Sequence, residues 1–441
     1  MIPGSAVTKD TKKAMELNTV EGAFAVAADN LAAPYLGLFA LALGATPSQI
    51  GMLTAFPNFM GNILQIPSAL LAERQKDKRL LIIVGSILNR SSWILMAFLP
   101  FLFAPERRVA IVIMLATFRI MAANLGVPAW TALQATLIPK SMRGKYYANR
   151  NMVLNGCAVL ATFLATFLLR LEFPTSYRVL FFLTTILGLM SVYLFSQIVF
   201  DQAPPKAKRA STDSYLKKMK AFAKEIRSQQ DFSSYVVSAI VWNLGIQMAS
   251  PLFVVYFVED LGGPAGFWAL FSAVNLASMV LIQRYWGRLA DFFGQKSVMM
   301  VSGLGIITMP LWWWIAPNIW FPFIIHIVNG VFWGGYNLAA FNLLLEVTPD
   351  DNRSVYVGVY NTMMGVATAV GPLVGGFAAE ILGLKPIFVA SAVMRALALY
   401  LFYRNVTNTG GRRMRMRDLV PGHKGKSNAP SIIAADYTTH N

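Results

Sequence analysis

Of the ionisable residues that lie inside strongly apolar segments, four are best placed to do chemistry. Asp29 and Glu21 fall in the first such segment, Arg119 in the fourth and His326 in the tenth. A charge at membrane depth costs on the order of 3 kcal/mol, so each needs a structural or functional reason. A carboxylate can bind a proton and lose its charge. We therefore expect Asp29 to carry a proton, with Glu21 or His326 second; the alternative for His326 is a packed polar residue.

Polar and aromatic side chains also recur at helical spacing, which places them on one face of a helix. Such faces occur in segments 109–138, 233–258 and 319–346. Tyr and Trp offer flat apolar surface with a hydrogen-bonding edge. The predicted ligand-binding residues are Arg119, Asn243, Gln247, Asn329, Trp333 and Tyr336.

Some of these residues have structural alternatives. Asn243 and Gln247 could form hydrogen bonds between helices. Trp333 could pack in a core. Arg90 and Arg395, in the middle of the third and twelfth segments, are expected to form structural pairs rather than to contact a ligand.

The composition requires lipid as the main solvent. Hydrophobic residues make up 56% of the 441 residues and charged residues 13%, whereas soluble domains average about 25% charged residues. A membrane span needs about 20 apolar residues. Twelve segments satisfy this requirement: 20–43, 49–72, 80–103, 109–138, 147–170, 178–200, 233–258, 265–286, 297–316, 319–346, 358–382 and 386–404.

The net charge of +17 indicates orientation and not a nucleic-acid partner. Of the 38 Lys and Arg residues, 29 fall on the termini and every second loop, and 5 fall on the remaining loops. Cytoplasmic loops carry such an excess, which places both termini in the cytoplasm. We expect a multi-pass protein of the cell membrane.

A motif in the first half of the chain recurs 210 residues later. Apolar segments flank both copies, which predicts two copies of one membrane unit fused head to tail. Repeats of this kind are typical of secondary transporters, whose ligand site lies between the halves near the bilayer midplane. The identities pair Pro139 with Pro349, Arg143 with Arg353, Tyr146 with Tyr356, and Asn151 with Asn361.

A second repeat carries a family resemblance. The segment GRLADFFGQK, residues 287–296, aligns with ALLAERQKDK, residues 69–78. The later copy resembles the cytoplasmic signature of the major facilitator superfamily, with Phe292 and Gln295 in place of the usual basic residues. The resemblance implies an all-α membrane protein of twelve transmembrane helices, in two pseudo-symmetric six-helix bundles around a central cavity that helices 1, 4, 7 and 10 line.

The two signature copies also predict a cytoplasmic gate. Glycine allows a sharp turn between close helices, and a carboxylate can face the positive end of a neighbouring helix. Asp291 and Glu73 would meet the cations Arg353 and Arg143; the alternative is a surface turn with solvated charges. The predicted gate residues are Glu73, Arg74, Arg143, Gly287, Asp291 and Arg353.

One further motif is a partial match. GPLVGG, residues 371–376, resembles the family's Gly-Pro packing motif. The form of that motif associated with exporters belongs in helix 5, where this chain has Ala161, Thr162, Ala165 and Thr166 instead. This departure argues against export without excluding it.

The sequence divides into five regions. They are a cytoplasmic tail (1–18), an N-terminal bundle (19–200), a basic linker with an amphipathic helix (201–232), a C-terminal bundle (233–404) and a basic, disordered tail (405–441). The linker helix would lie along the membrane surface; the alternative is an ordinary solvated linker helix.

These features predict a secondary transporter that moves a small solute by alternating access. The proton gradient would drive it, because the chain has no G-x-x-x-x-G-K-[ST] motif. The alternatives are export of amphiphiles, an intramembrane lipid-handling protein and a transporter-like sensor. We expect no enzyme activity, no cofactor and no metal, since the three His and Cys157 lack ligand spacing. The expected partners are a small-molecule substrate and the lipid bilayer, with no nucleic acid, and the chain is expected to be a monomer.

Overall fold

The described part of the chain folds into twelve long helical rods. The computed structural model describes residues 9–75, 77–138, 142–198, 229–348 and 353–407. In chain order the rods are α1 (Lys9–Ala32) continued by η1 (Ala33–Tyr35) and α2 (Leu36–Ala42); α3 (Pro47–Arg74); α4 (Lys78–Leu102); α5 (Pro105–Leu137); α6 (Arg143–Leu168); α7 (Thr175–Ser196); α9 (Gln230–Ala249) continued by α10 (Leu252–Glu259); α11 (Ala265–Phe293); α12 (Gln295–Trp314); α13 (Phe321–Glu346); α14 (Arg353–Leu382); and α15 (Leu384–Asn405).

Each rod coincides with one of the twelve predicted apolar segments. Among the described residues, ten helical stretches are long and apolar enough to cross a membrane, judged by length and composition. The first rod differs most from the prediction, because α1 begins at Lys9 inside the expected polar tail. The predicted linker helix and most of the C-terminal tail lie outside the described residues.

The first rod of each half is broken at a proline. Pro34 separates α1 from α2, and Pro251 separates α9 from α10. Proline cannot donate the backbone hydrogen bond that would continue a helix. A glycine with positive φ then follows each short helix, Gly44 at 89° and Gly262 at 64°. The two halves therefore share the same local interruptions, as a duplication requires.

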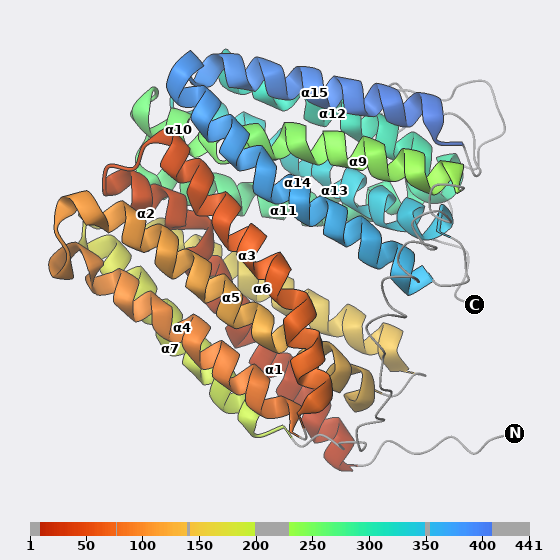
Figure 1. Ribbon diagram of the computed structural model, residues 1–441. Helices are drawn as coiled ribbons and strands as arrows, with labels where there is room; N and C mark the ends of the chain where they lie inside the picture. The colour runs from red at the N-terminus through yellow and green to blue at the C-terminus, as the bar shows by residue number, and fades with distance from the viewer. Residues whose placement is uncertain (1–8, 76, 139–141, 199–228, 349–352, 408–441) are drawn as a thin grey trace, which may run out of the picture.

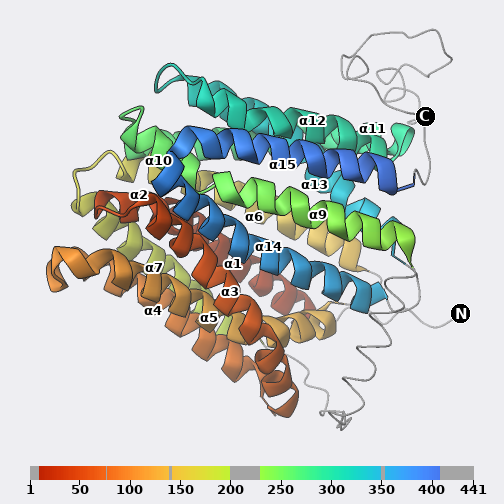
Figure 2. The same ribbon diagram turned by 45° about the horizontal axis from the view of Figure 1, so that its top comes forward.

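The rods form two bundles that pack against each other mainly through two pairs of helices. Helices α1 to α7 make one bundle and α9 to α15 the other (Figure 1). Between the bundles, α3 packs on α14, α6 packs on α11, and α10 contacts α2 and α3. Figures 1 and 2 both show α2 and α10 close together at one end, which we call the α2 end, and α1 and α9 directed toward the other end.

The hydrophobic core shows which end of the molecule is closed. At the α2 end one continuous cluster includes Tyr35, Phe39 and Trp93 of the first bundle with Leu252 and Phe257 of the second. Toward the opposite end the cores are separate. One, in the C-terminal bundle, contains Trp286, Tyr336 and Phe402, and the other, in the N-terminal bundle, contains Leu81, Leu133 and Phe195. Among the described residues, the two bundles thus share one apolar cluster at the α2 end and have separate clusters toward the other end.

Glycines in the GPLVGG segment allow α14 to approach two helices at once. A side chain at Gly375 would collide with the carbonyl of Met248 in α9. On the inter-bundle side, a side chain at Gly51 of α3 would collide with the carbonyl oxygen of Pro372. The motif therefore brings backbone against backbone, both within the C-terminal bundle and across to the N-terminal bundle.

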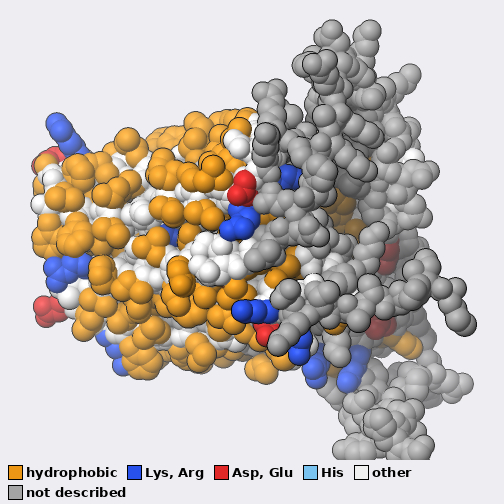
Figure 3. All heavy atoms as spheres, turned by 90° about the horizontal axis from the view of Figure 1, so that it is seen from below, with side chains coloured by type: hydrophobic (Ala, Val, Ile, Leu, Met, Phe, Trp, Pro, Cys, Tyr) orange, Lys and Arg blue, Asp and Glu red, His pale blue; other side chains and the backbone are white. Residues whose placement is uncertain are grey.

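The surface agrees with a lipid environment. Large apolar side chains such as Leu281 and Ile381 are each 82% exposed. Figure 3 shows apolar side chains across the middle of one face, with charged side chains gathered toward its two ends. A soluble protein would not leave so much apolar surface in water, whereas a band of this kind suits the hydrocarbon core of a bilayer.

Candidate functional site

An ion pair joins α1 to α4 in the middle of the N-terminal bundle. Arg90 donates through Nη1 to Oδ1 of Asp29, and through Nη2 to Oδ2 at 3.3 Å. The Arg90 side chain is only 10% exposed, whereas the Asp29 side chain is 49% exposed. The carboxylate is therefore held on one side and accessible on the other. This is the structural pairing expected for Arg90, and the partner of Asp29 is Arg90 rather than Arg119.

Small residues on α7 make room for this pair. A side chain at Gly188 would collide with the aliphatic stem of Arg90. Thr185, one turn earlier, donates through Oγ1 to the Arg90 carbonyl at 3.5 Å. A peripheral helix can therefore direct an arginine into the bundle.

Arg119 lies close to this pair but is not part of it. Its side chain is buried, and its guanidinium lies over the ring of Trp93 at 4.5 Å from the centroid. Asn89 donates to its backbone carbonyl at 2.8 Å, which fixes α5 against α4. Asp29 and Arg90 both act electrostatically on the guanidinium. Among the described residues, none accepts a hydrogen bond from it, and Nε is fully enclosed without a partner.

A second charged group lies nearer the open end of the bundle. Ser191 of α7 donates through Oγ to Oε1 of buried Glu21 at 2.8 Å. The buried Arg150 of α6 lies against Gly22, acts electrostatically on Glu21, and faces the ring of Trp130 at 6.0 Å. Counting charges by loop places Arg150 on the cytoplasmic side and misses this role. Its position two turns inside α6 was the signal that could have identified it.

The two repeat tyrosines make equivalent contacts in their own bundles. Tyr146 donates to the carbonyl of Met15 in α1 at 3.0 Å and accepts from Asn18 at 2.7 Å. Tyr356 is fully buried and packs edge-on against Phe232 of α9, with ring centroids 4.9 Å apart. Each motif therefore fixes the fifth rod of its half against the first.

The predicted ligand residues on α9 contact a neighbouring helix. Asn243 donates to the Ala239 carbonyl at 2.9 Å and lies 3.0 Å from the sulfur of Met364 in α14. Gln247 lies against Gly371, also in α14. These contacts match the alternative of packing between helices. Both side chains are half-buried, and their role in ligand binding stays a prediction.

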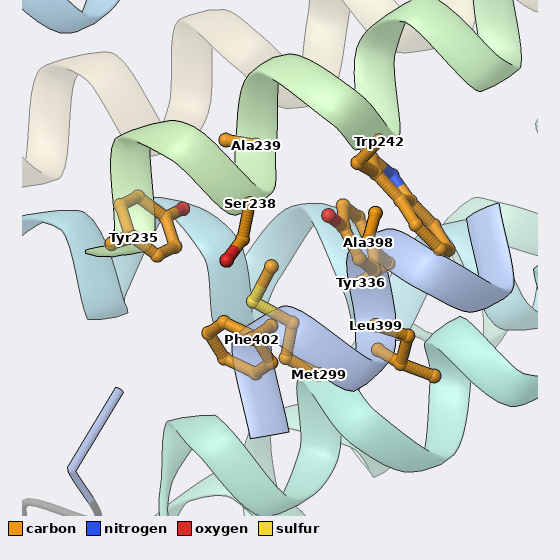
Figure 4. A pocket seen from close by; sticks show the side chains of 9 residues that line it. All are labelled: Tyr235, Ser238, Ala239, Trp242, Met299, Tyr336, Ala398, Leu399 and Phe402. Atoms are coloured by element: carbon orange, nitrogen blue, oxygen red, sulfur yellow. The ribbon is translucent and has the colours of Figure 1, made fainter. Parts of the chain in front are cut away.

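Tyr336 faces the interior of the C-terminal bundle. Its ring stacks on Trp242 at 4.9 Å, and Trp333 meets it edge-on at 5.5 Å. Figure 4 shows Tyr336 and Trp242 at a cavity between α9, α12, α13 and α15. The cavity measures about 10 Å³, which is room for about one water molecule. Tyr336 therefore belongs to the core of one bundle, because the helical stripe that predicted it does not fix how the helix is rotated.

Trp333 and Asn329 lie on the same helix and are half-buried. The structure records no contact among the described residues that joins them, or Asn243, to Asp29 and Arg119. Asp29 and Arg119 lie close together, and the convergence of the other side chains on the same space stays a prediction.

His326 lies in an aromatic enclosure at the α2 end. Its ring stacks on Phe271 at 5.5 Å and meets Trp268 and Trp313 edge-on at 5.6 and 6.1 Å. Neither ring nitrogen has a hydrogen-bond partner among the described residues. Asn275 donates instead to the His326 carbonyl at 3.0 Å. This environment matches the alternative of a packed polar residue.

The later signature copy makes a turn and a cap. Gly294 has φ 80° between α11 and α12, so it supplies the sharp turn, whereas Gly287 lies within α11 with open space around it. Lys296 donates to the carbonyls of Tyr403 (3.0 Å) and Val406, at the end of α15. A cation is favourable at that end of a helix.

The gate contacts themselves stay predictions. Asp291 is exposed, and the structure records no ion pair between it and a described side chain. The side chains of Glu73, Arg74, Arg143 and Arg353 lie outside the described part. Arg74 ends α3, and Arg143 and Arg353 begin α6 and α14, so the backbone places them at the open end of the bundles.

Comparison with known proteins finds relatives that are named as an efflux pump and a resistance protein. It is 32% identical over 140 residues to the multi-drug resistance efflux pump PmrA of Streptococcus pneumoniae, an alignment that covers 31% of this chain and 35% of the relative. It is 25% identical over 166 residues to the class H tetracycline resistance protein of Pasteurella multocida, covering 38% and 41%. The aligned regions thus span less than half the length of these curated relatives.

Solved structures match over nearly the whole chain. A mutant of the nucleoside transporter NupG superimposes with a TM-score of 0.71 at 12% identity, covering 89% of this chain and 100% of that one. A bacterial homologue of the iron transporter ferroportin, in an inward-facing state, superimposes with a TM-score of 0.69 at 12% identity, covering 89% and 98%. Identities this low establish the fold alone. The family model of the Major Facilitator Superfamily matches residues 22–284 and 236–430, so the chain belongs to the Major Facilitator Superfamily.

Proposed function

We propose that this protein is a proton-coupled secondary transporter that moves a small solute across the cell membrane by alternating access. The observation that carries the proposal is the ion pair of Asp29 with Arg90. The carboxylate of Asp29 is half-exposed in the middle of a span. An ion pair at such a depth does not stabilise the fold more than apolar residues would.

The physical sequence of events follows from the pair. With Asp29 ionised, Arg90 neutralises it and holds α1 against α4. A proton on Asp29 removes the attraction and leaves Arg90 and Arg119 as neighbouring positive charges. Because the two bundles share a core only at the α2 end, a change in packing around α1 can alter how the bundles close. Proton binding and bundle rearrangement would then be linked.

We also propose an orientation in the membrane, roles for two further residues and a monomeric state. Both termini would lie in the cytoplasm, so that the structure faces inward. Arg119 would contact the solute, and Glu21 would be the second proton carrier. The chain would act as a monomer, without enzyme activity and without a bound cofactor.

Export of amphiphilic compounds is a second candidate. PmrA and the class H protein, by their names, are an efflux pump and a resistance protein. The residues of helix 5 argue against it, because Thr162 and Thr166 each donate back to the preceding turn of α6, at 2.8 and 3.1 Å, where the exporter form of the motif would lie.

Reconstituted vesicles test the proposal. A panel of radiolabelled solutes would be screened with an imposed pH gradient, comparing the full chain with Asp29→Asn. We expect accumulation driven by the gradient in the parent and at most exchange in the variant. Accumulation that is indifferent to both the gradient and the substitution would exclude proton coupling through Asp29.

A further inference from the structure

The described spans of the N-terminal bundle hold more positive than negative charge in their interior. The buried guanidiniums are those of Arg90, Arg119 and Arg150, and the carboxylates are those of Asp29 and Glu21. Three positive groups face two negative ones. Burying a charge costs several kcal/mol unless a counter-charge and hydrogen bonds compensate it, and the described carboxylates of the bundle interior are one too few to compensate all three guanidiniums.

Arg119 is the group to which no described carboxylate is hydrogen-bonded, although Asp29 acts on it electrostatically. Both oxygens of Asp29 accept from Arg90, and Glu21 lies in the field of Arg150. Arg119 is only 7% exposed. None of its guanidinium nitrogens donates to a described residue, and Nε is enclosed. Buried polar groups in proteins nearly always have partners, so this guanidinium is set up to bind a group that arrives from elsewhere.

Its surroundings also define which atoms can approach. One face of the guanidinium is covered by the Trp93 ring at 4.5 Å. The Trp93 ring does not cover the planar edge, which carries the N–H donors. That edge matches two oxygens of a carboxylate or phosphate, which it binds through paired charge-assisted hydrogen bonds.

We propose that the transported solute is a small anion with a carboxylate or phosphate group, and that this group binds the edge of Arg119 beside the Asp29–Arg90 pair. The inference rests on the proposed transport function and specifies its substrate class.

The same geometry sets the direction of coupling. An anion on Arg119 places a second negative charge next to Asp29, and the two repel each other unless a proton neutralises one of them. Proton and anion therefore bind together, and together they add no net charge to the bundle. A proton and an anion that together carry no net charge cross the bilayer at the lowest free-energy cost. The arrangement predicts symport; a cationic solute would compete with the proton and give antiport.

Binding measurements on the purified full-length chain test this without requiring transport. The probes are acetate, inorganic phosphate and the matched set of benzoate, benzamide and benzylamine, with ligand-dependent thermal stabilisation as the readout. We expect stabilisation by at least one of the anions and none by benzamide or benzylamine. The Arg119→Gln variant should lose affinity at least tenfold, because hydrogen bonds to a charged group contribute about 1.5–3 kcal/mol.

Two further variants serve as controls. Arg119→Lys keeps the charge but not the planar edge, and should weaken anion binding while preserving the fold. Arg107→Gln removes an exposed cation at the start of α5 and should change nothing. A preference for benzylamine, a response to anions that survives Arg119→Gln, or no response to any anion would each overturn the inference. If spin-labelled protein still alternates between two bundle arrangements in those cases, the proposed transport function stands and only the substrate class is wrong.

Discussion

Arg90 on α4 holds both carboxylate oxygens of Asp29 on α1, so a helix expected at the periphery supplies the counter-charge for the midplane acid. Breaking such a pair costs more than removing it, since a single substitution leaves an uncompensated charge. We expect Arg90→Gln to lower the stability of the purified protein by about 3 kcal/mol. The double variant with Asp29→Asn should recover a large part of that loss in thermal unfolding. If the stability lost in the double variant equalled the sum of the losses in the two single variants, a direct pair would be contradicted.

Gly188 should be intolerant of any side chain. A Cβ at this position meets the stem of Arg90, so Gly188→Ala must displace the arginine from Asp29. We expect a destabilisation of about 1–3 kcal/mol, as for other overpacked sites, with a matching loss of gradient-driven uptake. Gly156→Ala in α6 is the control, because a Cβ there meets nothing within 4 Å. Equal effects at both positions would show that helix propensity, not the clash, decides the outcome.

Glu380 links the two bundles at the α2 end. It accepts from the backbone nitrogen of Ser48 at 3.4 Å, at the start of α3 in the other bundle, and interacts with the Thr46 hydroxyl. We expect Glu380→Gln to shift the population toward separation at this end, by a factor of about five for a contribution of about 1 kcal/mol.

Electron–electron distance measurements would detect this shift, with spin labels at Glu106 and Asn318 in a Cys157→Ser background. Asp260→Asn is the matched control, since this exposed carboxylate interacts with Lys385 of its own bundle. An unchanged distance distribution in Glu380→Gln would mean that the contact contributes nothing to closure.

Lys296 caps the last carbonyls of α15, and its removal should act locally. We expect Lys296→Met to increase hydrogen exchange over the last turn of α15, around 402–406, by several-fold, as loss of about 1 kcal/mol of capping requires. The cavity residues at Trp242 and Tyr336 should keep their protection. Protection that is lost throughout α15 would instead indicate a global role.

The sequence was sufficient to predict the twelve helical rods, but not how each rod is rotated about its own axis. Twelve apolar segments predicted twelve rods because a span must satisfy its backbone internally and can only be helical. Whether Tyr336 faced the centre or its own bundle depended on a rotation that packing determines, and spacing along one helix carries no information about it. The same applies to Gln247, which lies against Gly371 of α14.

The charged site was predicted in part. Hydropathy identified Asp29 and Arg119, since a charge in an apolar run is conspicuous. It could not identify Arg90 as the partner, because that pairing depends on Gly188 of a third helix making room. Arg150 lies inside the predicted segment 147–170, but its contact with Glu21 depends on how two helices pack, which a count of charges does not reveal.

The proline breaks in the first rod of each half have a mechanical consequence. Each separates a short outer piece, α2 or α10, from the longer helix that carries the polar residues. The short pieces belong to the shared core, so we expect them to tilt as independent flaps about Pro34 and Pro251. The closed end would then open by rotation of α2 and α10 about these prolines, while α1 and α4, which hold the ion pair, keep their relative positions.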